Sequence, residues 1–484
     1  MPLSRRLTTG LGIATVTTLA AITGAPLTVV AAPAPAHVTA ARDAAAWLAG
    51  EFTDGTLPGP FTPEDWGLTI DGLVALSATG VDAPTRQAAT AQAAKHVRSY
   101  NSYDDWGIEG FTDGGATAKL LYAASAAGAD PTDFGGYDLR AETLSLIAGA
   151  DAGHQRGRIT SRTTADSGPD ASNTFDQSFA VLGLARSGDL PQETVDFLLR
   201  QQCAAGGFRL YPDTADGPSS SCDEQPGATL DVDSTAMAVQ ALLAAAEDGA
   251  TGAGDAARKG ADWLVAQQHA DGSFGGSGPT TGANSNSTGL AGQALAAAGR
   301  DDDAARAAKA LAALQLTAGD GGAASADAGA IAYNTDGLTA ATAGGITDTD
   351  RDQWRRATAQ ALLGLAQVPL GRIGLDTPPT STPTPTGTAS PTAPATPTAS
   401  PTLTTSPPPT GTAGPTPSVT SPPATPAPTT AAPTTAAPPI TTPAASGLGG
   451  LPTTGAAIGS YLLIALLLIG GGVTLLVLGR RRAG

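Results

Sequence analysis

Segments rich in alanine, leucine and glycine recur along the first 375 residues of the chain, and polar loops separate them. Within each segment the apolar residues follow a helical spacing, as in 233–246 and 287–298. The expected outer helices begin near Ala41, Pro84, Tyr137, Pro191, Asp255 and Asp303, and the expected inner helices begin near Trp66, Gly114, Phe175, Asp233, Ser287 and Asp336. The pattern therefore predicts an all-α fold of six helical hairpins.

Two phrases show the repeat most clearly. Residues 197–208 read Phe-Leu-Leu-Arg-Gln-Gln and then Gly-Gly-Phe, and residues 263–274 read Trp-Leu-Val-Ala-Gln-Gln and then Gly-Ser-Phe. Such long-period repetition is typical of solenoids and closed rings. A ring needs no polar terminal caps, whereas an open solenoid, the alternative, does. We predict that residues 37–375 form a six-hairpin α/α toroid with a pocket at one end of its axis.

The N-terminal 36 residues have the features of an export signal. Arg5 and Arg6 precede an apolar stretch from 11 to 30, and Ala34-Pro35-Ala36 supplies the small residues that a signal peptidase accepts. We therefore expect residues 1–36 to be a signal peptide that is removed from a secreted protein.

Residues 376–450 consist mostly of proline, threonine, alanine and serine, and 377–447 contain no charged residue. A segment without an apolar pattern cannot offset the entropy of ordering it. The composition predicts a disordered, extended linker that reaches across a cell wall.

The last segment, 451–484, combines a short motif with a membrane-spanning pattern. An apolar run from 456 to 478 is long enough to cross a bilayer, and arginines 480–482 would stay on the cytoplasmic side. The five preceding residues resemble the LPXTG sorting signal of Gram-positive surface proteins; they are Leu451, Pro452, Thr453, Thr454 and Gly455. The resemblance implies that a sortase cuts before Gly455 and joins Thr454 to peptidoglycan. The helix would then anchor only the precursor in the plasma membrane, and the mature protein would be secreted and anchored to the cell wall.

The net charge of the chain is −17 at pH 7. A surface this acidic repels nucleic acid, so we expect no nucleic-acid partner. The same charge is typical of a soluble protein displayed on a surface.

The two cysteines, Cys203 and Cys222, fit an oxidising exterior, and their even count predicts one disulfide. An alternative remains open, because Cys222-Asp223-Glu224-Gln225 has the Cys-x-Glu-Gln spacing of the internal thioester in complement-like proteins. With a thioester the chain would be a covalent adhesin.

The repeat resembles that of the prenyltransferase and squalene cyclase family. The resemblance rests on Lys259-Gly260, Trp263-Leu264, Gln268 and Gly272-Ser273-Phe274. It implies the α/α toroid, in which the repeat glutamine hydrogen-bonds the loop backbone and the next helix terminus while the aromatic residue packs beneath. These motifs indicate fold and not chemistry.

One phrase carries candidate chemistry. Asp231-Val232-Asp233-Ser234 resembles the DVDDTA phrase of the cyclases, whose middle aspartate, here Asp233, donates a proton to an alkene or epoxide. A cyclase-like enzyme acting on an isoprenoid, with Asp233 as general acid, is therefore one hypothesis. The alternative is that Asp233 only stabilises the first turn of its helix, as Asp176 would do in the preceding inner helix.

A second resemblance points to binding. Residues 284–295, which begin with Asn284, are similar to a phrase of cobalamin carriers of the intrinsic factor type, in which an aspartate and an asparagine hold the corrin amides. It implies Asp233 and Asn284 as contacts and cobalamin as a possible ligand. Both residues would lie at the mouth of neighbouring inner helices. We include Asp231, Asp176, Trp66 and Trp106 as further ligand-binding candidates at the mouth, the tryptophans either stacking on a ligand or packing.

We predict no metal site and no resident cofactor. The four histidines, His37, His96, His154 and His269, lack ligand spacing. Asp348, Asp350 and Asp352 resemble half a calcium loop, but Gln353 stands where the turn glycine belongs, so the segment predicts a helix start with Trp354 on its apolar face. The preferred hypothesis is a wall-anchored, non-catalytic ring that binds a small molecule or surface ligand at its mouth.

Overall fold

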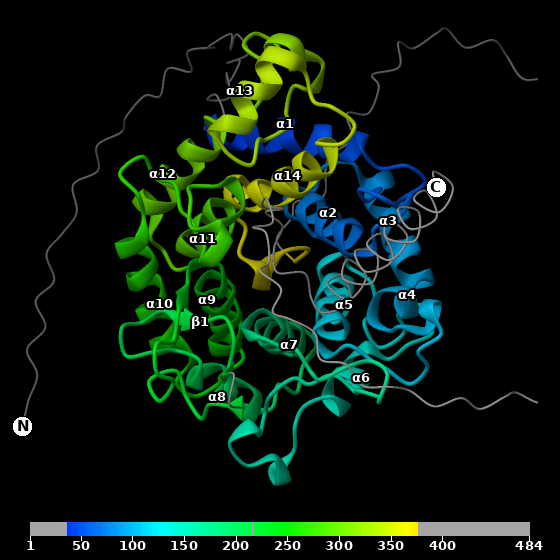
Figure 1. Cartoon of the computed structure of the whole chain (residues 1–484), viewed down its shortest axis with the longest axis vertical. Helices are drawn as coiled ribbons and strands as arrows, with labels where there is room; N and C mark the ends of the chain where they lie inside the picture. The colour runs from blue at the N-terminus through cyan, green and yellow to red at the C-terminus, as the bar shows by residue number, and fades with distance from the viewer. Residues whose placement is uncertain (1–35, 215–216, 376–484) are drawn as a thin grey trace, which may run out of the picture.

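The computed structural model describes residues 36–214 and 217–375. The signal peptide, the linker and the sorting signal predicted above lie outside these residues. The described chain is all-α apart from two short strand pairs, and it forms the predicted six-hairpin α/α toroid (Figure 1). No helix within these ranges is long and apolar enough to cross a bilayer.

An inner ring of helices surrounds the axis (Figure 1). Each inner helix contacts the next, and the last contacts the first, so the ring is closed. Alanine, glycine and small polar residues dominate the buried faces and let the helices approach closely. In ring order the helices are α2 (Trp66–Thr79), α5 (Gly114–Ala126), α7 (Thr174–Ser187), α9 (Val232–Glu247), α11 (Ser285–Ala297) and α14 (Arg351–Ala366).

Outer helices cover this ring, each with one apolar face inward. In α12, for example, Ala304, Ala307, Ala308 and Leu311 are the buried residues, and they share one helical face. The outer helices are α1 (Ala36–Gly50), α3 (Ala83–Lys95), α6 (Leu139–Ser145), α8 (Gln192–Arg200), α10 (Ala253–Gln267) and α12 (Asp301–Ala312), with α4 (Val97–Asn101) as a short addition. The strand pairs are β1 (Phe208–Arg209) with β4 (Leu230–Asp231) and β2 (Asp213–Thr214) with β3 (Gly217–Pro218), both antiparallel.

The repeat glutamines have the stapling role that the family resemblance implied. The Gln202 side-chain amide donates to the carbonyl oxygens of Gly206 in its own loop and Ala256 in the next outer helix, at 2.8 and 2.9 Å. Gln268 repeats the arrangement with Gly272 and Asp303, at 3.0 and 2.9 Å. The repeat aromatics, Phe208 and Phe274, are fully buried beneath.

The expected sixth inner helix near Asp336 is wrong. The helix there, α13 (Thr335–Gly344), packs mainly on η4 (Gly322–Asp327), outside the ring, and Ala341 is its one buried residue. The inner position belongs to α14, which begins where the aspartate-rich segment predicted a helix start and buries Trp354. The apolar face of α14 is longer than that of the short, threonine- and glycine-rich α13, so α14 buries more surface at the inner position.

A recurring hydrogen bond confirms that α14 is an inner helix. The backbone N–H of Phe208 donates to the Thr235 hydroxyl of α9, and that of Phe274 donates to the Thr288 hydroxyl of α11, both at 2.9 Å. At the third position the N–H of Ile331 donates to Thr358 of α14, again at 2.9 Å. The chain from 331 to 350 is thus an extension of one hairpin.

Ion pairs join the two ends of the ring. The Glu51 carboxylate, at the end of α1, accepts hydrogen bonds from Arg351 and Arg355 of α14, at 2.7 and 2.9 Å. Arg356 pairs with Asp65, the N-cap of α2, at 2.5 Å. We call this group the seam, because it holds the last inner helix against the first hairpin.

The end of the described chain closes one side of the ring. Residues 367–375, which include η5 (Leu370–Arg372), cross its centre (Figure 1). The Gln240 side chain accepts from the N–H of Leu370 at 3.0 Å, and Arg186 donates to the carbonyl oxygens of Gly371 and Ile373 at 2.6 and 2.8 Å. Arg186 lies in the last turn of α7, so this plug sits at the C-terminal ends of the inner helices.

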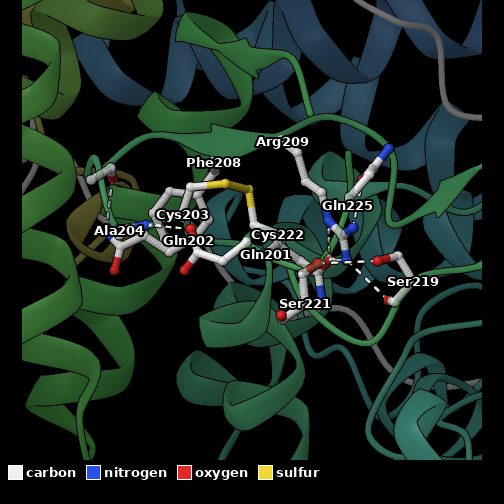
Figure 2. Close-up of a disulfide and its surroundings, with 12 residues drawn as sticks. Gln201, Gln202, Cys203, Ala204, Phe208, Arg209, Ser219, Ser221, Cys222 and Gln225 are labelled. Atoms are coloured by element: carbon white, nitrogen blue, oxygen red, sulfur yellow. Dashed lines mark hydrogen bonds between the residues drawn. A yellow bond between two sulfur atoms is a disulfide. The ribbon is translucent and has the colours of Figure 1, made fainter. Parts of the chain in front are cut away.

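A disulfide joins Cys203 to Cys222, with the Cα atoms 4.9 Å apart (Figure 2). The fully buried Arg209 guanidinium holds the enclosed loop, because it donates to the side chains of Gln201 and Gln225. Burial lowers the pKa of Arg209 to about 10. With Cys222 in the disulfide and the Gln225 oxygen bound to Arg209, the thioester alternative has no free thiol.

Candidate functional site

The ring encloses a cavity on its axis. It contains about 500 Å³ of space, part of it open to solvent. Every inner helix contributes lining residues, and Leu370 of the plug lines it too. The apolar side chains include Val74, Tyr122, Phe179, Met237, Leu290 and Leu363, one from each inner helix. The cavity lies between the mouth, formed by the N-terminal ends of the inner helices, and the plug.

Three polar side chains interrupt the apolar lining. Lys119 of α5 pairs with Asp71 of α2 at 2.6 Å. Burial alone would lower the pKa of Lys119, but the charges of Asp71 and Tyr100 raise it above its ordinary value. On α14, which neighbours α2 in the ring, the buried Gln360 side-chain oxygen has no hydrogen-bond partner within the described chain. A ligand could therefore meet both a fixed ion pair and an open acceptor.

Asp233 lies at the mouth, one helical turn before Met237 on the same face of α9. Its side chain is buried, and its Oδ1 accepts no hydrogen bond from any described residue. Burial, and then the charge of Asp231, raise the pKa of Asp233 to about 7, although the Ser287 hydroxyl opposes the shift. At neutral pH this carboxyl can therefore both donate and accept a hydrogen bond.

The other two polar candidates on these helices act as caps. The Asp231 carboxylate accepts from the N–H and hydroxyl of Ser234. Asn284 accepts from the N–H of Ser287 at 2.8 Å, and its amide donates to the carbonyl oxygens of Thr280 and Gly282. Both side chains hold the first turns of α9 and α11, and Asn284 has its amide hydrogens engaged by its own loop.

Asp176 occupies the first turn of α7, and its Oδ2 completes a capping box with Asn173 at 2.8 Å. Its Oδ1 is buried and unpartnered within the described ranges. Burial, and then the charge of Asp113 on the neighbouring helix, raise the pKa of Asp176 well above its usual range. The structure therefore places a second carboxyl with a raised pKa at the mouth, between α5 and α7.

The two candidate tryptophans differ. Trp66 stacks on His96, with ring centroids 4.2 Å apart, and packs against the core. Trp106, in η1 (Asp104–Trp106), is 54% exposed and tilts against Tyr103 with ring centroids 5.3 Å apart. Only Trp106 therefore presents a large exposed ring.

Sequence reasoning missed Asp71, Lys119, Gln360 and Asp113. Lys119 carries a usable signal, because a lone cation inside an otherwise apolar inner helix needs a buried partner. Asp113 precedes two glycines at the start of α5, and that sequence also signals a close approach by another group. The described residues contain no cluster of three or more histidines, cysteines and acids that could hold a metal ion.

No protein-family model matches the sequence, and no curated protein matches it. Among solved structures, the chain is similar to an α-1,6-mannanase of Salegentibacter sp. HEL1_6 in complex with α-1,6-mannotriose, at 14% identity over 68% of this chain and 99% of the other, with a TM-score of 0.46. It is similar to an unsaturated glucuronyl hydrolase from Bacillus sp. GL1 at 13% identity, over 70% and 96% of the two chains, with a TM-score of 0.44. A protein geranylgeranyltransferase-I of Candida albicans matches at 10% identity, over 62% and 83%, with a TM-score of 0.40. At these identities and scores the similarities say nothing of substrate or activity.

Proposed function

We propose that this chain is a cell-wall-anchored binding protein whose ring holds a small amphipathic molecule. The apolar part of the ligand would fill the axial cavity, and its polar end would hydrogen-bond Asp233 at the mouth. The sorting motif at 451–455, the export signal and the linker support the surface location.

The observation that carries the binding proposal is the composition of the cavity. Its mostly apolar walls, interrupted by a few convergent polar groups, are typical of small-molecule sites. Gln360 Oε1 offers a buried acceptor that the ring leaves unsatisfied. Leaving such a group unpaired costs about 1–3 kcal/mol, which a ligand donor would recover.

A second candidate function is acid chemistry at Asp233. The observation that favours it is the pKa of about 7, because an acid with this value is half protonated at neutral pH. The corrinoid hypothesis uses the same aspartate but depends also on Asn284, whose amide is engaged in capping.

A titration of the intact chain, kept in amphipol so that no free detergent competes, tests the binding proposal. The probes are 1-decanol, an isoprenoid alcohol and cyanocobalamin, and the readouts are calorimetry and native mass spectrometry. Leu290→Trp would fill the cavity, and Gln360→Met would remove the acceptor at nearly equal volume. Leu375→Trp, at a residue that is 64% exposed, is the matched control.

We expect 1-decanol to bind one-to-one, with at least tenfold weaker binding in Leu290→Trp, several-fold weaker binding in Gln360→Met and no change in Leu375→Trp. Thermal melts of each variant separate lost binding from lost folding. Equal binding by all three variants would refute the axial site. Heat with cyanocobalamin that disappears in Asp233→Ala and Asn284→Ala would favour the corrinoid instead, and turnover of the isoprenoid that disappears in Asp233→Asn would favour the enzyme.

The location has its own test. Thr454→Ala removes the residue that a sortase would join to peptidoglycan. We expect muramidase to release the parent chain from the wall fraction, and the variant to move to the membrane or the medium. An unchanged distribution would refute wall anchoring.

A further inference from the structure

A second pocket lies at the mouth, away from the axis, between the first turns of α5 and α7. Asp113, Asp176, Tyr103, Phe111 and Ser172 are among its lining residues. It contains about 340 Å³, part of it open to solvent, and carboxyl and hydroxyl groups line it beside two aromatic rings. It thus differs in chemistry from the axial cavity, where apolar side chains dominate.

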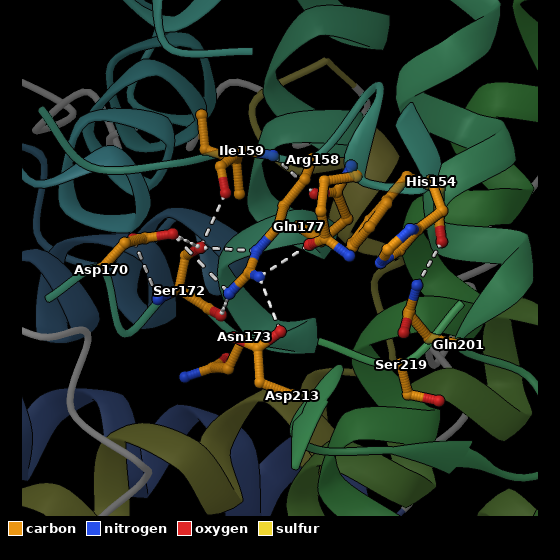
Figure 3. A network of polar contacts seen from close by, with 12 residues as sticks. His154, Arg158, Ile159, Asp170, Ser172, Asn173, Gln177, Gln201, Asp213 and Ser219 are labelled. Atoms are coloured by element: carbon orange, nitrogen blue, oxygen red, sulfur yellow. Dashed lines mark hydrogen bonds and ion pairs between the residues drawn. The ribbon is translucent and has the colours of Figure 1, made fainter. Parts of the chain in front are cut away.

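The loop that frames this pocket is fixed by its own hydrogen bonds (Figure 3). The buried Arg158 guanidinium donates to the Ser172 hydroxyl at 3.1 Å and pairs with Asp213 at 2.9 Å. The Asp170 carboxylate accepts from the backbone N–H groups of Ser161 and Ser172, at 3.0 and 3.2 Å. The pocket wall is therefore held in place by polar groups that satisfy one another.

Asp176 is the exception in this wall. The residue is 2% exposed, and its Oδ1 has no partner in the part of the chain that the structure describes. Gly115 of α5 makes room for it, because a Cβ atom there would lie 2.0 Å from this oxygen. Buried polar atoms are almost always hydrogen-bonded, so this unpartnered carboxyl oxygen, on a residue that lines the pocket, is a candidate partner for a group that enters the pocket.

Aromatic rings flank the same pocket. Tyr103 stacks on Phe111, with ring centroids 4.0 Å apart, and both line the wall. The exposed Trp106 is not a lining residue, but it contacts Tyr103, with ring centroids 5.3 Å apart. A flat, partly apolar ligand could lie against these rings while its edge reaches the carboxyls.

We propose that this pocket binds a neutral carbohydrate, with sugar hydroxyls on Asp176 and Asp113 and the C–H face of a ring on the surface of Tyr103 and Trp106. Sugar hydroxyls both donate and accept hydrogen bonds. They therefore suit the carboxyl of Asp176, whose pKa is raised, and the neighbouring carboxyl of Asp113. The ligand is neutral because the pocket has no cationic lining residue among the described ones and belongs to a chain of net charge −17. The site is separate from the axial cavity and does not depend on it.

The test titrates the intact chain with maltotriose, α-1,6-mannotriose and chitotriose up to 10 mM, with trigalacturonate as the acidic comparison, and follows saturation-transfer NMR and calorimetry. Asp176→Asn keeps an oxygen that can accept the capping hydrogen bond from Asn173, but it replaces the unpartnered Oδ1 with an amide NH₂ group. Trp106→Ala removes an exposed ring and should not disturb folding. Phe61→Ala, at a residue that is 75% exposed elsewhere, is the matched control.

We expect at least one neutral trisaccharide to bind, and each of Asp176→Asn and Trp106→Ala to weaken binding at least tenfold. Phe61→Ala and the cavity-filling Leu290→Trp should bind as the parent does, which separates this site from the axial one. The proposal is overturned if no neutral trisaccharide binds, if trigalacturonate binds more tightly, or if both site variants retain full affinity. If Asp176→Asn fails to fold, Trp106→Ala still decides.

Discussion

Replacing Asp233 with asparagine tests the central electrostatic feature of the mouth. The folded chain raises the pKa of this carboxyl from 3.8 to about 7, first through burial and then through the charge of Asp231. The folded chain therefore accommodates the protonated carboxyl better than the ionised one. This carboxyl costs no stability below about pH 4, the loss grows as the pH rises, and it is complete above about pH 7. A pKa difference of about 3 corresponds to about 4 kcal/mol, which is an upper bound on the effect.

Asparagine cannot ionise, so Asp233→Asn should resemble the parent below about pH 3.5, exceed it in stability by about 1.6 kcal/mol at pH 5, and exceed it by up to about 4 kcal/mol at pH 8.5. Urea unfolding of both chains at pH 5, 7 and 8.5 measures this difference. Asp302→Asn, at an exposed residue in the first turn of α12, is the matched control and is measured at the same pH values. If the difference in stability between Asp233→Asn and the parent does not change with pH, the pKa of Asp233 is not raised. That result would refute its role as both donor and acceptor at neutral pH.

Three further predictions concern stability and are measured by denaturant unfolding. Gly289→Ala would place a Cβ atom 2.3 Å from the carbonyl oxygen of Gln360 and force α11 away from α14, at a loss of about 2 kcal/mol in the free energy of unfolding. In the control Gly254→Ala the nearest atom to the new Cβ would be 3.7 Å away, so this variant should be neutral or stabilising. Equal effects of the two variants would contradict the close packing of α11 on α14. Glu51→Gln removes the negative charge that two seam arginines share and should lower the free energy of unfolding by about 2 kcal/mol. The control Glu247→Gln, in an exposed ion pair, should lower it by less than about 0.5 kcal/mol. If Glu51→Gln leaves the stability unchanged, the seam does not depend on these charges. Replacing Cys203 and Cys222 with serine opens a link between residues 19 apart and should cost about 3 kcal/mol, and a reductant that left the parent's stability unchanged would argue against the disulfide.

The sequence predicted the parts of the fold that local pattern controls. The glutamine staple and the hairpin starts follow from repeated phrases, and the aspartate-rich segment before Trp354 signalled the start of α14. The sixth inner position was missed because the phrase near Asp336 also begins a helix, and only packing against α2 and α11 decides which helix lies inside.

The site was less predictable, because its groups meet across helices that are distant in the chain. Asp233 and Asp176 were found as acidic residues in first turns. Nothing local to Asp71 indicates that Lys119 is its partner, and the role of Gly115 appears only once α7 brings Asp176 against it. Asn284 was chosen as a ligand contact, and the structure shows that it is engaged as a helix cap, a role the sequence prediction did not give it.

The plug gives the ring a direction. Inner helices run from the mouth toward residues 367–375, and α1 runs the opposite way, so the described chain both enters and leaves at the closed side. Residue 375, where the described chain ends, therefore lies on the side of the ring opposite the mouth. If the proposed wall anchor holds the chain from this side, it would leave the mouth uncovered, and both proposed binding sites would face away from the wall.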